Sequence, residues 1–229
     1  MSENKTGQYL KYAIGEIVLV VIGILIALQV NTWNQNRISK NKESLLLREL
    51  NEEFKLNRTQ LDTILIKHRM ALEGCNKLIE MFPIDIQNHS LDTITKYLTN
   101  SLHSWTFNPS QGVVKSITNT SSFDIISNDE LRKLLVSWQD LVIDYQEDEI
   151  DARIMVQTTM DEYLMNHFNY DFDFTDERND FGALQSMEFE NLIKSRRGYL
   201  LDVLGDYNNL DELEFNIEKI IELTTPDLK

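Results

Sequence analysis

The chain has 229 residues, of which 42% are hydrophobic and 26% charged, and its formal net charge is −15. This acidity argues against nucleic-acid partners and against adhesion to an anionic lipid surface. Eight glycines and three prolines favour long helices over an all-β domain, and the single cysteine, Cys75, has no intrachain disulfide partner.

The first predicted element is a single transmembrane helix from Tyr12 to Trp33. A bilayer core of ~30 Å needs ~20 mostly apolar residues, because a helix rises ~1.5 Å per residue. The uninterrupted apolar centre runs from Ile17 to Leu28, so Glu16 is expected near a membrane edge. A cleaved signal peptide needs a small-x-small site after the apolar run. The residues that follow here offer none, so a retained span is favoured over a signal peptide or a buried soluble helix.

One face of this helix is a candidate interface for self-association. Gly23 and Ala27 form a small-xxx-small pair, which lets two helix backbones approach closely. Glu16 lies seven residues before Gly23 and therefore falls on nearly the same face. Three roles stay open for Glu16: a place at the headgroup level, a hydrogen bond across the helix interface, or proton conduction.

The membrane helix is predicted to continue directly into a stalk helix that ends near Glu80, before Phe82-Pro83. Its inward side chains recur in steps of three and four, which is the heptad pattern of a coiled coil or bundle. Asn57 lies within this pattern. Asn57 is expected either to set the register of an oligomer or, as we favour, to contact a local partner in the core of a bundle. The seam residues are Leu47, Leu50, Phe54, Asn57, Leu61, Ile64, His68, Ala71, Cys75 and Leu78.

Two shorter helices are expected next. Ser90 is a suitable N-cap for a helix that ends near His103. Asn108-Pro109 is predicted to begin the following helix, with proline at the first helical position, and the polar run 119–122 ends it.

Two long helices complete the chain. Ser127 and Glu130 form a capping box that is predicted to open a helix over 128–168. Ser186 is expected to cap the last helix, which continues to about residue 223. Gly198 and Gly205 lie inside that last helix, where they suggest close helix approach. Three long amphipathic helices predict an all-α fold, an elongated antiparallel bundle carried by the membrane helix.

Three stretches carry a resemblance to a known family. The run 5–34, with its Lys-Thr-Gly-Gln-Tyr-Leu-Lys-Tyr-Ala-Ile-Gly-Glu start, and the later motifs 105–109 and 122–132 resemble an uncharacterised Bacteroidota family of single-pass membrane proteins. The resemblance implies a bacterial cytoplasmic membrane protein of no known activity. The basic N-terminal segments of the family imply a soluble domain on the periplasmic side. We therefore expect a tail and membrane helix over residues 1–36, and an acidic helical domain over 37–229.

The sequence offers no convincing catalytic, cofactor or metal site. None of the four histidines lies in a metal-binding helix frame. The loop after Asp171 resembles a calcium loop, but its sixth position is Asp176 and its twelfth is Gly182, where glycine and glutamate are needed. The carboxylate run from Glu147 to Asp151 is expected to be a solvated helix face.

These observations predict a non-enzymatic membrane-anchored protein. Its partners are membrane lipid together with either further copies of itself or a partner membrane protein, and no nucleic acid. The alternative is an extracytoplasmic sensor or adaptor whose bundle binds a small ligand or ion.

Overall fold

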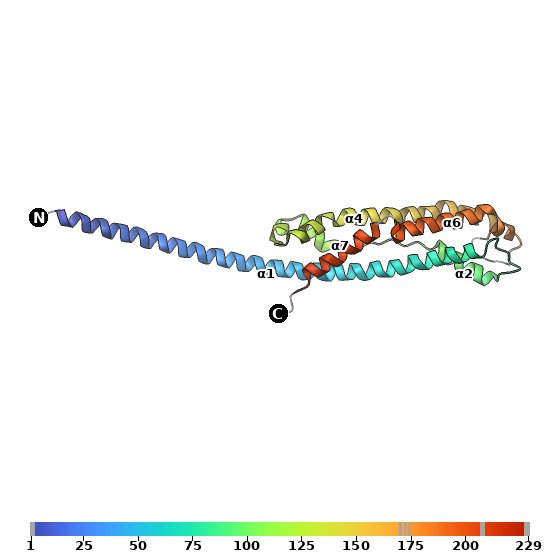
Figure 1. Ribbon diagram of the computed structural model, residues 1–229, viewed down its shortest axis with the longest axis horizontal. Coiled ribbons are helices and arrows are strands. Elements are labelled where there is room, and N and C mark those ends of the chain that lie inside the picture. The colour runs from blue at the N-terminus through green and yellow to red at the C-terminus, as the bar shows by residue number, and fades with distance from the viewer. Residues whose placement is uncertain (1–2, 170, 172, 174, 207–208, 227–229) are drawn as a thin grey trace.

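The computed structural model describes residues 3–169, 171, 173, 175–206 and 209–226. This described part is helical with no strand, which confirms the all-α prediction. Figure 1 shows one long helix whose N-terminal part projects from an elongated bundle. The fold is therefore a projecting helix joined to a helical bundle, as predicted.

The long helix α1 runs without a break from Glu3 to Glu80. At 78 residues it is about 117 Å long. The described side chains of residues 14–42 are exposed apart from the half-buried Asn34, and full burial begins at Leu50. Helix α1 is therefore both the projecting segment and one of the bundle helices.

The bundle is completed by two antiparallel helical rods that pack on α1. The first consists of α4, η2 and α5 in unbroken succession, and the second consists of α6, η4 and α7. The short helix α2 lies along the end of α1. The bounds are α2 Leu91–Leu102, α3 Gly112–Thr118, η1 Ser121–Ile125, α4 Asp129–Ile154, η2 Met155–Met160, α5 Asp161–His167, η3 Phe181–Gln185, α6 Met187–Leu201, η4 Asp202–Asp206 and α7 Asn209–Thr224.

Two apolar clusters lie one after the other along the long axis of the bundle. The cluster nearer the projecting helix is centred on Phe54 and Trp138, whose ring centroids are 4.8 Å apart. The farther cluster includes Cys75 and Phe189. Each large apolar side chain buried in this way contributes about 1.5–3 kcal/mol. The predicted α1 seam is buried from Leu50 onward, so the heptad pattern identified the inward face correctly.

Two predicted helix starts are wrong. The helix expected at Pro109 begins at Gly112, because the backbone of Ser110 is bound by Asn57 in a non-helical conformation. The cap of α4 is Asn128, whose side chain accepts from the backbone N–H of Leu131. The predicted capping residue, Ser127, instead donates its backbone N–H to Glu43 of α1.

Both long C-terminal rods contain π-helical segments that the sequence analysis did not predict. The predicted cap, Ser186, does begin α6. The helix then breaks at Gly205, whose φ of 114° favours glycine because it carries no Cβ. At Gly198 no neighbouring atom lies within 4 Å of the position that a methyl group would occupy, so this glycine marks no close approach.

Candidate functional site

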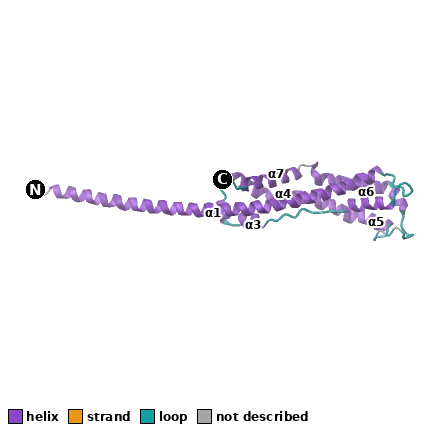
Figure 2. Ribbon diagram, turned by 90° about the horizontal axis from the view of Figure 1, so that it is seen from below, coloured by secondary structure: helices purple, strands orange, loops and turns teal. Residues whose placement is uncertain are grey.

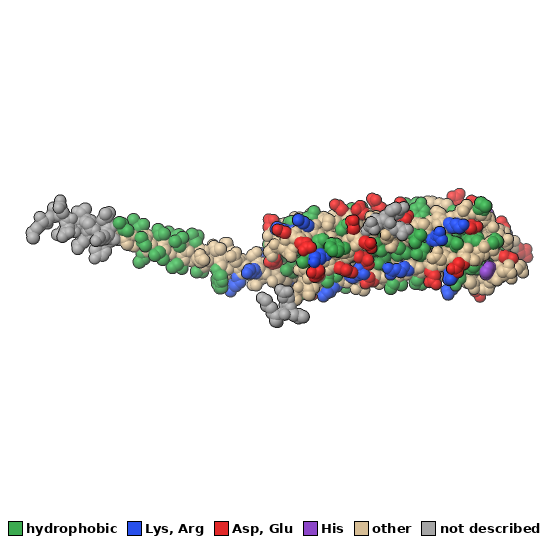
Figure 3. Space-filling model, viewed as in Figure 1, with side chains coloured by type: hydrophobic (Ala, Val, Ile, Leu, Met, Phe, Trp, Pro, Cys, Tyr) green, Lys and Arg blue, Asp and Glu red, His purple; other side chains and the backbone are tan. Residues whose placement is uncertain are grey.

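The residues proposed for membrane-helix association all lie on the projecting part of α1. Glu16, Gly23 and Ala27 are exposed, and no other part of the described chain lies within 4 Å of a side chain placed at Gly23. The segment from residue 14 onward is long and apolar enough to cross a membrane, and a signal sequence has the same properties. The side chain of Tyr12 lies outside the described part. Figure 3 shows hydrophobic side chains covering this projecting segment.

A second feature is the non-helical stretch of residues 103–111, here called the crossing segment. It joins α2 to α3 and runs along α1, as Figure 2 shows. Asn57 of α1 donates from Nδ2 to the carbonyl of Ser110 (2.9 Å) and accepts the Ser110 backbone N–H (2.8 Å). Glu53 accepts the Ser110 hydroxyl and the backbone N–H groups of Val113 and Val114. The local partner predicted for Asn57 is therefore a backbone group.

The centre of the crossing segment is held by a buried acid. Glu149 of α4 is 1% exposed, and its Oε2 accepts the backbone N–H of Phe107 at 2.7 Å. Its Oε1 lies 3.0 Å from Nε2 of His68 on α1, which is also buried. The prediction that 147–151 forms a solvated face is thus wrong at Glu149. A buried backbone N–H needs an acceptor, and this carboxylate supplies one.

The beginning of the crossing segment is held by Arg196 of α6, which is fully buried. Its guanidinium donates to the carbonyls of Ser101 (3.0 Å), His103 (2.9 Å) and Ala152 (2.6 Å). An additional bond reaches the hydroxyl of Ser104. Arg196 thereby joins α6, α4 and the crossing segment through neutral acceptors.

Burial sets the ionisation of these groups. It raises the pKa of Glu149, although the hydrogen bonds from His68 and Phe107 act in the opposite direction. It lowers the pKa of Arg196 to about 10 and raises the pKa of the Cys75 thiol to about 12. A thiol with so high a pKa is not a nucleophile at neutral pH, which agrees with the packed position of Cys75.

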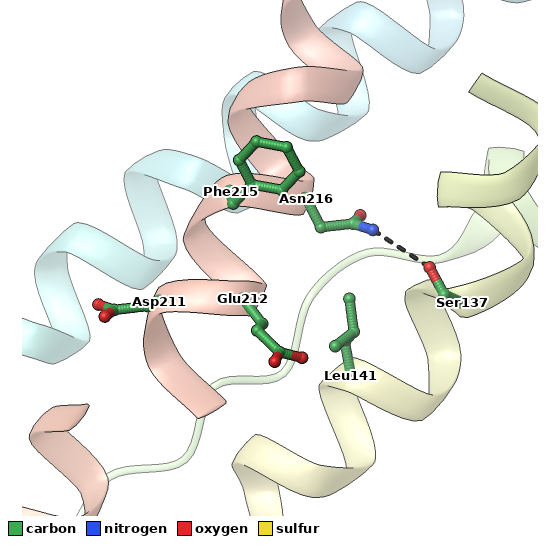
Figure 4. Close-up of a pocket in the computed structure, with 6 residues that line it drawn as sticks. All are labelled: Ser137, Leu141, Asp211, Glu212, Phe215 and Asn216. Carbon is green, nitrogen blue, oxygen red and sulfur yellow. Dashed lines mark hydrogen bonds between the residues drawn. The ribbon is translucent and has the colours of Figure 1, made fainter. Parts of the chain in front are cut away.

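A surface groove of about 430 Å³ lies between α4 and α7. Figure 4 shows its lining, with Glu212 of α7 pointing toward Leu141 of α4. Phe215 is 61% exposed on the α7 side. Asn216 is 2% exposed and donates from Nδ2 to the Ser137 hydroxyl, while its Oδ1 has no hydrogen-bond partner.

In the acidic loop between α5 and η3, the side chains form hydrogen bonds within the loop itself. Asp176 accepts from Arg178 and from Asn169, and these bonds hold the pKa of its carboxyl well below the usual range. Asp173 accepts from Thr175. Within the described residues, no group of three or more His, Cys, Asp or Glu side chains is placed to hold a metal ion.

Residues 16–163 match a family of unknown function, DUF6090. The chain belongs to DUF6090. No curated protein and no solved structure matches it. The DUF6090 match includes Glu53, Asn57 and Glu149, and it spans the crossing segment. It ends before α6 and α7, so Arg196 and the α7 side of the groove lie outside it.

In this DUF6090 protein the buried charged residues Glu149 and Arg196 were missed in the sequence analysis, although a signal was present. Glu149 follows Val142 and Tyr145 and precedes Ala152 in steps of three and four, so it occupies a core position of α4. Arg196 lies between Ile193 and Leu200 in the same way. A charged residue that lies three or four positions from buried apolar residues on both sides is therefore expected to be buried, even where it belongs to a run of charged residues.

Proposed function

We propose that this protein is a non-enzymatic, single-pass protein of the bacterial cytoplasmic membrane, with its bundle on the periplasmic side, that acts by binding other proteins or further copies of itself. The observation that carries the proposal is the continuity of α1. An exposed apolar segment and a bundle helix belong to one unbroken helix. An exposed apolar surface of this kind is stable in lipid and costly in water.

The proposed membrane position is supported by the residues at the end of the span. Trp33 is exposed, and the guanidinium of Arg37 lies 5.4 Å from the centre of its ring. Tryptophan is enriched where the bilayer meets water. The basic residues Lys40 and Lys42 follow toward the bundle and are exposed. They offset Lys5 and Lys11 before the span, so the charges beside the span do not set its orientation, and the periplasmic side rests on the resemblance.

Self-association is proposed to involve the face that carries Glu16, Gly23 and Ala27. Small side chains there permit close backbone contact between two parallel helices. Glu16 then lies against protein or headgroups and avoids the hydrocarbon.

Fractionation and topology reporters test the membrane proposal. The full chain is expected in the membrane fraction after lysis without detergent. A C-terminal reporter that is active only in the periplasm is expected to be active. Recovery of the intact chain in the aqueous fraction, or activity of a cytoplasmic reporter alone, contradicts the proposal.

Cross-linking in membranes tests self-association. Gly23→Ile is expected to reduce the cross-linked dimer by about tenfold, because a bulky side chain separates the helices. The matched control is Leu25→Ile, which changes a side chain on another face of the same span. Equal dimer yields for the two variants contradict the proposed interface.

A further inference from the structure

The groove between α4 and α7 has no role in membrane anchoring, yet it combines three features of a docking site. Its walls are mainly apolar, its volume is about 430 Å³, and it lies between two neighbouring helices. Phe215 presents 61% of its surface to solvent at the edge of this groove. We propose that the groove binds a positively charged, amphipathic helical segment of a second protein.

The apolar side of the proposal rests on Leu141 and Phe215. These residues come from different helices and leave a space between them that their own chain does not fill. A third helix packing along two others inserts side chains into such a space. The incoming helix supplies an apolar side chain, and the exposed Phe215 ring is buried against it.

The charge of the partner follows from the acids beside the groove. Glu212 points into the groove from α7. Asp144 follows Ser137 by two helical turns on α4 and so lies on the same face. Neither carboxylate forms an ion pair within the part of the chain that the structure describes. Lysine or arginine side chains of a partner would complement both.

Asn216, which lines the groove, carries an unused hydrogen-bond acceptor. Oδ1 of Asn216 is buried without a partner, while Nδ2 is used by Ser137 and by the carbonyl of Leu134. A buried acceptor without a donor carries a cost of about 1–3 kcal/mol. Because Oδ1 has almost no accessible surface, a polar donor of the bound segment would remove that cost only if the Asn216 amide turned toward the groove.

We assign the segment to a second protein, with a second copy of the chain as the competing occupant, and this step rests on the proposed membrane position. Arg58 of α1 pairs with Glu214 of α7, which places the groove level with residues 54–58. That level is about 35 Å beyond Trp33 along α1. The basic residues 37–42 of a second copy in the same membrane lie far below it, and a second groove presents the same acids. Lys55 of a second copy is exposed and lies level with the groove, so it is the contact that a second copy would make. Lipid is excluded by the same distance.

Peptide binding to the full chain in nanodiscs of zwitterionic lipid tests the proposal. The probes are three fluorescent helical peptides of about four turns. They share one leucine stripe and carry Lys, Gln or Glu at the other positions. The Lys peptide is expected to bind at least about tenfold more tightly than the Gln peptide, and the Glu peptide more weakly still. Equal binding of the three peptides, or no binding of the Lys peptide, overturns the proposal.

Variants locate the binding. Phe215→Ser and Glu212→Lys are each expected to weaken the binding of the Lys peptide by about tenfold. The matched control is Leu56→Ser, which removes a 69%-exposed leucine from α1 and is expected to change binding by less than about twofold. If the control and Phe215→Ser behave alike, the peptide binds elsewhere and the proposal fails.

A cysteine variant tests the competing occupant. Phe215→Cys, alone or together with Lys55→Cys, treated with a short bifunctional maleimide in membranes is expected to give no covalent dimer through position 215, whether or not the membrane helices associate, since the native Cys75 is buried. A dimer linked through position 215 shows that a second copy covers the groove, which overturns the proposal. Failure of the membrane proposal would instead appear as full-length chain in the aqueous fraction, so the two failures are distinguishable.

Discussion

Removing the carboxylate of Glu149 is expected to loosen the bundle at the crossing segment. In Glu149→Ala the backbone N–H of Phe107 and Nε2 of His68 lose their hydrogen-bond partner while they remain buried. Each buried polar group left without a partner costs about 1–3 kcal/mol. The variant also relieves the burial of an acid, so we expect a net loss of about 3 kcal/mol. Glu149→Gln keeps one acceptor oxygen and is expected to lose about 1 kcal/mol.

The same carboxyl group gives a pH dependence with a defined sign. The folded-state pKa of Glu149 is raised above the ordinary value of 4.5, chiefly by burial. The native state therefore holds this proton more tightly than the unfolded state. The stability that Glu149 contributes is fully present below pH 4.5 and is lost as the pH rises through the folded pKa. The stability difference between wild type and Glu149→Gln should fall over that window, by at most about 1.4 kcal/mol per pH unit.

Denaturant unfolding of the full chain in detergent, followed by far-ultraviolet circular dichroism, measures both effects. Glu147→Ala is the control, because Glu147 belongs to the same charge run but is exposed; its effect should stay within about 0.5 kcal/mol. The reasoning is refuted if Glu149→Ala matches Glu147→Ala, or if the pH dependence has the opposite slope.

Three further predictions concern α1 and the last helices. Asn57→Ala removes both hydrogen bonds to Ser110 and should cost about 2 kcal/mol in denaturant unfolding; an unchanged midpoint would contradict the assigned role. A methyl group at Gly74 would lie 2.7 Å from a backbone oxygen of α2, so Gly74→Ala should destabilise by about 1–3 kcal/mol. Gly198→Ala meets no neighbour and should stabilise by about 0.5–1 kcal/mol; thermal melting that ranks the two alike would refute this contrast. Cys75 should react with maleimide only after unfolding, since burial raises its pKa to about 12; rapid labelling of the native chain would contradict its buried position.

The helices that follow local rules were predictable from the sequence. The α1 seam has heptad spacing over about thirty residues, and Ser90 and Ser186 cap helices as expected. Pro109 shows where local rules fail. Proline suits the first turn of a helix, but Asn57 and Glu53, more than fifty positions earlier, bind the next residue in an extended path. The hydrogen bonds from these distant residues stabilise the non-helical path more than the preference of proline for the first helical turn stabilises a helix start there.

The candidate sites divide in the same way. Glu16, Gly23 and Ala27 lie within twelve residues of one helix, so helical spacing alone places them on a common face. The polar contacts at the crossing segment join positions that are far apart in the chain, such as His68 with Glu149 and Ser101 with Arg196. Sequence periodicity shows that such a residue is buried, and only the fold shows what it contacts.

Because α1 is unbroken, a tilt of its proposed membrane segment would move the far end of the bundle. The helix has no proline between the span and Glu80, and from Trp33 to Glu80 it extends about 70 Å. A tilt of about 10° of the anchoring segment would then move the far end of the rod sideways by about 12 Å. Because the crossing segment fastens α1 to α4, the whole rod would swing with it. A small change in the packing of associated membrane helices would thus produce a large displacement at the end of the bundle farthest from the membrane.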